Sequence, residues 1–171
     1  LGSTPATSGQ GKYKIDAGST TTIYNGAAVA SNAGYIIDGQ TTDAPILGVL
    51  NGIFYNAATT LKPTFANFYK QPITPANSED IDAFVFDNPQ QQYVVATDDS
   101  VAQSGYLETY DMNTSAGDDT TGKSSATLDI GDTSADAASF RLLRSAEDPE
   151  NDENAAFRSV VVVPNLIELQ S

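Results

Sequence analysis

The sequence predicts an all-β fold, an antiparallel β-sandwich or barrel with long acidic loops and little or no helix. Segments rich in β-branched and aromatic residues recur at roughly ten-residue spacing, with Gly, Asn, Asp and Pro between them, as in antiparallel sandwiches and barrels. No stretch of ten residues keeps a 3.6-residue hydrophobic period, and the best helix candidate, residues 133–140, is short and Ala-rich. A length of 171 residues suits one domain.

The chain opens with a segment that reads as an arm. Residues 1–10 are small and polar and contain Pro and Gly, so we expect a flexible N-terminal arm followed by a single β-rich domain over residues 11–171. Such an arm can order against a neighbouring molecule, although chain ends are commonly idle and disordered.

A hairpin is predicted near the start of the domain. Residues 12–16 alternate between polar and apolar, which is typical of a half-buried strand. Residues 20–24 are β-branched and aromatic, and Asn25-Gly26 follows at once, which predicts a two-residue turn with residues 27–30 as the returning strand.

A long apolar segment over residues 46–55 leaves two readings open. Its central Asn51-Gly52 is either a turn between two strands or a bend within one long strand. The other strand candidates share β-branched or aromatic residues between turn signals, and they are residues 34–37, 65–69, 83–86, 92–96, 106–110, 126–130, 140–143 and 158–163.

The chain is strongly acidic, and its charged residues are unevenly distributed along the sequence. The net charge is −14; the chain up to position 70 carries four basic and three acidic residues, and the remainder carries four basic and nineteen acidic ones. Nucleic-acid and anionic membrane surfaces are bound mainly through Lys and Arg, so we expect neither partner. The acid excess also serves solubility. No apolar run approaches the roughly 20 residues of a membrane helix.

Catalytic signatures are missing. The chain has no Cys and no His, which excludes Ser–His–Asp and Cys–His nucleophile arrangements within it. The sequence contains no Gly-rich phosphate-binding loop, and no catalytic motif surrounds any neighbouring Ser and Lys. Paired carboxylates such as Asp80 and Asp82 are the residue type that glycosidases use, but the chain is short for a hydrolase cleft and has no Trp for stacking on a sugar. We therefore expect no enzyme and no cofactor.

Acidic turns are the remaining candidates for an ion site. Ca²⁺ takes several carboxylate and carbonyl oxygens, and Asp98-Asp99 and Asp118-Asp119 supply such oxygens in turn-like sequence. Neither fits the EF-hand spacing, so solvated turns are the competing interpretation and no metal is predicted outright.

A partner-binding face is expected in the near-neutral first part of the chain, because charged residues are depleted at interface cores and Tyr is favoured there. The predicted contact residues are Lys12, Tyr13, Tyr24, Tyr55, Lys62 and Tyr69.

The order of several motifs resembles a known group of proteins. The motifs are YxIDxGxxTxIYxGxxV (residues 13–29), ILGVxxGxxY (46–55), KPxFxxxYxxxxT (62–74), IxAFVFDxPxxxYxV (81–95) and VVVVPNxxEL (160–169). In this order the chain resembles small virion structural proteins encoded beside the major capsid protein in marine and cyanobacterial tailed phages.

This resemblance implies a β-rich capsid decoration (cement) protein on the outside of the virion. Its expected partners are the major capsid protein and further copies of itself, often as a trimer, and the family offers no catalytic residues to carry over. Two alternatives stay open: another virion component, such as a head–tail connector, a head-fibre base or a tail element, or a Ca²⁺-dependent carbohydrate-binding β-sandwich.

Overall fold

The computed structural model describes residues 9–39, 45–113, 117–131, 138–152, 155–165 and 168. It confirms the all-β, antiparallel fold class: the described strands form two antiparallel sheets, and the named helical elements are two short 3₁₀ turns. The elements in chain order are β1 (Gln10–Ile15), β2 (Ala28–Asn32), β3 (Tyr35–Asp38), β4 (Gly48–Asn56), β5 (Pro63–Ala66), η1 (Ala76–Ser78), β6 (Ile81–Phe86), β7 (Tyr93–Ala96), η2 (Gln103–Gly105), β8 (Thr109–Tyr110), β9 (Phe140–Ser145) and β10 (Ser159–Pro164).

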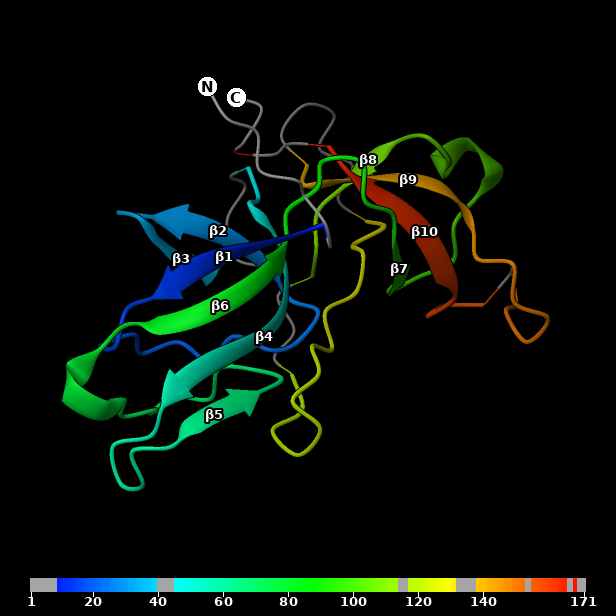
Figure 1. Ribbon diagram of the computed structural model, residues 1–171. Coiled ribbons are helices and arrows are strands. Elements are labelled where there is room, and N and C mark those ends of the chain that lie inside the picture. Colours follow the sequence, from blue (N-terminus) through cyan, green and yellow to red (C-terminus); the bar gives the residue numbers. More distant parts are fainter. Residues whose placement is uncertain are drawn as a thin grey trace.

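The larger sheet is built around β4. Its strand order is β1-β6-β4-β2-β3, and β5 pairs with the far end of β4 (Figure 1). β6 follows one edge of β4, while the other edge is shared by β2 near the start of the strand and β5 near its end. β1 and β3, which end the strand order, still contact each other, so the sheet curls toward a barrel.

The inside of this curl is the first hydrophobic core. β6 shows how the sequence builds it: Ile81, Ala83 and Val85 are fully buried, and the residues between them point outward, as the two-residue period of a strand requires. The other buried members of this core are Ile15, Ile23, Ala27, Val29, Ile36, Leu47, Leu50, Ile53 and Tyr69.

The smaller sheet has the order β7-β10-β9-β8 and packs beside the larger one (Figure 1). Its inner face forms a second core with Leu142, Val160 and Val162. The larger sheet contributes Ala28 and Val49 to that core, so the two sheets pack as a sandwich-like unit through shared apolar contacts.

The predicted Asn25-Gly26 hairpin is wrong, although its turn forms. The Ala27 amide donates to the Tyr24 carbonyl at 3.1 Å, and Gly26 has a φ of 81°. However, Ile23 bridges to Tyr69, and the strand after the turn pairs with β3 and β4. Tertiary partners far along the chain replace the local pairing that the dipeptide favours.

Asn51-Gly52 is a bend within one strand. β4 runs through it with a register shift between Leu50 and Gly52 against β6, so the second of the two readings is correct. Residues 126–130 form no strand, and only Leu128 makes isolated bridges there.

Two predicted features lie partly outside the described residues. Of the helix candidate, residues 133–137 are outside them, and Phe140 already begins β9. Residues 1–8 of the predicted arm also lie outside, and β1 begins at Gln10.

Candidate functional site: an aromatic face bordered by lysines

The outward residues of the larger sheet are unusually apolar at its centre. On β6, Phe84 shares the outward side with Asp82. On β4, Phe54 lies opposite Asp82 on one neighbour and opposite Phe65 of β5 on the other. These three phenylalanines therefore lie on the solvent side of the sheet, away from the first core.

The ring of Phe65 pairs with each of the other two rings. The ring centroids of Phe54 and Phe65 are 4.8 Å apart at an interplanar angle of 51°, and those of Phe65 and Phe84 are 6.3 Å apart at 18°. Both separations lie in the range of favourable aromatic pairs. Phe65 is nevertheless 74% exposed, so the cluster leaves a large apolar area in water.

Two lysines border the rings on the β1 side. Lys12 pairs across the sheet with Phe84, and Lys14 with Asp82. Both ammonium groups reach the one carboxylate: Lys12 Nζ lies 2.7 Å from Asp82 Oδ2 and Lys14 Nζ lies 2.6 Å from Asp82 Oδ1. We call these six residues the aromatic face: Lys12, Lys14, Phe54, Phe65, Asp82 and Phe84.

The electrostatics of this face follow from the shared carboxylate. Burial of Asp82 opposes its ionisation, but hydrogen bonds from Lys12 and Lys14 outweigh burial and lower the pKa of Asp82 below its usual value. The hydrogen bond to Asp82 likewise raises the pKa of Lys14. Two cations therefore meet one anion at Asp82, although Glu79 and Asp80 also lie near Lys14, on a molecule whose net charge is −14.

A shallow hollow of about 510 Å³ lies beside Phe65 and Phe84. Gly52, which pairs with Phe84, lines this hollow and adds no side chain to it. A Cβ at Gly52 would lie only 3.0 Å from the Ala66 carbonyl oxygen, so the site favours glycine. The hollow offers a partner a recess flanked by aromatic rings.

Of the sequence-predicted contact residues, Lys12 belongs to the aromatic face. Lys62 is exposed at the end of the β4–β5 hairpin, where its carbonyl accepts the Ala57 amide at 3.1 Å. Beside it, Leu61 is 71% exposed with a φ of 53°.

The four predicted tyrosines serve other contacts. Tyr69 is fully buried in the first core and donates its hydroxyl to the Ser19 carbonyl at 2.9 Å, so it packs and does not present a surface. Tyr13 donates to Asp87 at 2.7 Å, and burial, with that hydrogen bond, raises the pKa of Tyr13 to about 12. Tyr55 packs partly against the same core. Tyr24 stacks on Phe68 with ring centroids 5.7 Å apart and donates its hydroxyl to Asp119.

The weak metal candidates bond chiefly to neighbouring protein groups. Asp98 accepts the Ile130 amide at 2.9 Å, and Asp99 accepts the Ser100 amide. Asp118 accepts the Thr120 amide, while Asp119 accepts the Tyr24 hydroxyl at 2.8 Å and pairs with Lys70. Across the described ranges, no group of three metal-ligating side chains lies close enough to hold an ion.

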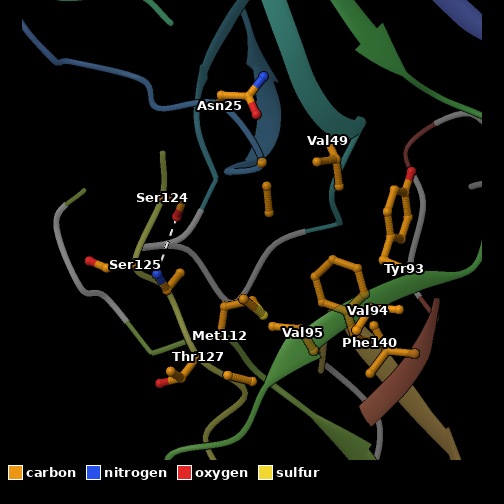
Figure 2. Close-up of a pocket in the computed structure, with 15 residues that line it drawn as sticks. Asn25, Val49, Tyr93, Val94, Val95, Met112, Ser124, Ser125, Thr127 and Phe140 are labelled. Carbon is orange, nitrogen blue, oxygen red and sulfur yellow. Dashed lines mark hydrogen bonds between the residues drawn. The ribbon is translucent and has the colours of Figure 1, made fainter. Parts of the chain in front are cut away.

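A second feature is a groove of about 380 Å³ between the two sheets. Figure 2 shows its two walls: β7 with Tyr93 to Val95 on one side, and the segment with Ser124, Ser125 and Thr127 on the other. Val49, Met112 and Phe140 also line it. None of the described lining residues is charged. We call this space the inter-sheet groove.

Sequence reasoning missed the three phenylalanines of the aromatic face. The sequence did carry one signal, the two-residue alternation over residues 81–86. It puts Phe84 on the same side of the strand as Asp82 and on the opposite side from Ile81 and Val85. Assigning Phe54 and Phe65 to that side required the cross-strand register, which the sequence does not show.

Comparisons with known proteins add no relative. No family model, no curated protein and no solved structure matches the chain. In the part of the chain that the structure describes, no helix has the length and hydropathy of a membrane span.

Proposed function

We propose that this chain is a structural protein of a phage head that binds the outside of the capsid lattice through the aromatic face. The observation that carries the proposal is the aromatic cluster on the outer side of the sheet, in which Phe65 is exposed and Phe54 and Phe84 are half-buried. Aromatic side chains are enriched in protein interfaces, and contiguous exposed apolar surface is a common sign of one.

The charge pattern supports docking in one orientation. Lys12 and Lys14 place positive charge beside the rings, whereas the acidic residues from position 71 onward lie outside the aromatic face except for Asp82. A lattice surface with apolar recesses and acidic borders fits the aromatic face and repels the acidic loops. Most acidic residues then stay in solvent, which suits an exterior protein. The motif order described above agrees with this role.

Partner chemistry and copy number follow from the same idea. The proposed partners are the major capsid protein and further copies of this chain on neighbouring lattice sites, with a trimer at each threefold position as the expected form. Many equivalent sites need a small, rigid module whose contact surface changes little on binding. A β-sheet that holds its contact residues by cross-strand packing meets that need.

The test is the stoichiometry of purified source particles by quantitative mass spectrometry. A decoration protein should be present at about one copy per coat subunit, or one trimer per threefold site, because each lattice position offers the same surface. A dozen copies or fewer would contradict the proposal in favour of a connector, fibre base or tail element. Absence from particles would leave the Ca²⁺-dependent binding module.

A further inference from the structure

β7 is an edge strand with an open side. It pairs with β10 along one edge, and among the described residues no strand pairs with the other. The Ala96 carbonyl points to that open side, since it accepts the Leu128 amide at 2.8 Å. Backbone groups of successive strand residues point to opposite sides, so Val94 also directs its N–H and C=O there. Val95, opposite Val160, faces β10.

The inter-sheet groove lies along this open side. Thr97 and Leu128 form a parallel bridge, and the Asp98 amide donates to the Leu128 carbonyl at 3.1 Å. From that junction, residues 124–127 and β7 separate and become the two walls of the groove (Figure 2). A wedge between two extended segments, with strand donors and acceptors on one wall, has the form that accepts an added strand.

We propose that residues 1–8 of the same chain occupy the inter-sheet groove as an added strand along β7. Reach supports this occupant. β1 begins at Gln10, which lies opposite Phe86, and the Phe86 carbonyl accepts the hydroxyl of Tyr93 at 3.0 Å. Tyr93 lines the groove, so the chain enters β1 beside it. Eight extended residues span up to about 26 Å, enough to reach Tyr93 and continue along the strand.

Chemistry supports the same occupant. The segment LGSTPATS carries no charged side chain, and neither does the described lining of the groove. Leu1 is its one large apolar side chain and matches the apolar surface of Val95 and Phe140. Pro5 is tolerated in an edge strand where its missing N–H faces away from the pairing side. A tethered segment also meets its own groove at an effective concentration of order millimolar, which favours it over a second copy.

The chain contains one Met and no Cys, which allows a direct test in the full-length protein. Met112 lines the groove, so its ¹³C-methyl signal is a single NMR reporter of occupancy. A nitroxide attached to Ser3→Cys should abolish this signal by paramagnetic broadening. The matched control is a nitroxide at Thr60→Cys, in the exposed turn between β4 and β5, which should leave the signal intact.

Two further samples make the test decisive. Val94→Pro removes the groove-facing N–H without touching the bonds of Tyr93 and Val95 to β10, so it should restore the Met112 signal of the labelled Ser3→Cys chain. A mixture of nitroxide-labelled chains without ¹³C and ¹³C-labelled chains without nitroxide should show no broadening. An unbroadened Met112 signal in labelled Ser3→Cys would overturn the proposal, and broadening in the mixture would assign the groove to the segment of another copy.

Discussion

The two sheets have cores of similar make-up but different outward surfaces. Outward positions of β4, β5 and β6 hold the three rings of the aromatic face, with Lys12 and Lys14 sharing one carboxylate. Outward positions of β9 hold Arg141 and Arg144, whose guanidinium groups donate to oxygens of neighbouring residues.

The two sheets use their outward cations differently: those of the smaller sheet bond to its own loops, and those of the larger sheet lie beside apolar rings. The β9 arginines hold the smaller sheet to its own loops: Arg141 donates to the Leu107 carbonyl at 2.7 Å and Arg144 to the Gln92 side chain at 3.3 Å. On the larger sheet, Lys12 and Lys14 keep 60% and 49% of their side chains exposed beside apolar rings. The larger sheet therefore combines exposed ammonium groups with apolar rings, which is why we propose it as the surface that a second protein covers.

The largest expected effect tests whether the two sheets are one folding unit. Leu50→Ala in the first core and Leu142→Ala in the second should each lower the free energy of unfolding by about 2–5 kcal/mol, because both residues are fully buried. Chemical denaturation should show one transition for each variant, since Ala28 and Val49 join the cores. Two separate transitions would mean that the sheets unfold independently.

A smaller effect is expected at Tyr13, which ties β1 to the end of β6. Tyr13→Phe removes the hydrogen bond to Asp87 and should lower the free energy of unfolding by about 1–2 kcal/mol at pH 7. The pKa of Tyr13 is about 12 in the folded chain and about 10 when unfolded, so this contribution is complete below pH 10 and declines between pH 10 and 12. Stability measured over that range should fall less steeply in the variant; parallel curves would contradict this.

Substitutions at Asp82 and Asp119 compare the stability contributed by a carboxylate that two lysines share with that of an exposed ion pair. Asp82→Asn should lower the free energy of unfolding by about 1 kcal/mol and Asp119→Asn by clearly less, since both partners in the Lys70–Asp119 pair are more than half exposed. The lowered pKa of Asp82 means that its contribution is present above pH 4 and is lost as the pH falls further. The free energy of unfolding should therefore fall less steeply below pH 4 in Asp82→Asn than in the unmodified chain. Equal slopes in Asp82→Asn and Asp119→Asn would argue against the carboxylate shared by two lysines.

The smallest effect concerns the acidic turns. Asp98, Asp99 and Asp118 already accept backbone amides, so millimolar Ca²⁺ should leave the melting temperature unchanged after correction for ionic strength with Na⁺. Differential scanning calorimetry with matched NaCl measures this. A rise specific to Ca²⁺ would favour the carbohydrate-binding alternative over the capsid proposal.

The sequence predicted the fold class well because strand periodicity and turn residues are local signals. It also singled out Lys12, which lies beside the rings of the aromatic face, and it kept open the bend at Asn51-Gly52. It failed at Asn25-Gly26, where partners distant along the chain decide the pairing. It also placed Tyr69 at a surface, although side-chain direction depends on register, and the Ile23–Tyr69 bridge draws this residue into the core.

The central claim is that the aromatic face binds the capsid lattice, and a rebinding measurement tests it most directly. Particles stripped of this chain would be titrated with Phe65→Asp and with Phe157→Asp, which changes a comparably exposed ring elsewhere on the molecule, at 69% against 74%. A hot-spot aromatic contributes about 2 kcal/mol or more, so Phe65→Asp should weaken binding by at least about 30-fold, and Phe157→Asp by less than about twofold. Equal affinity of the two variants would contradict the account.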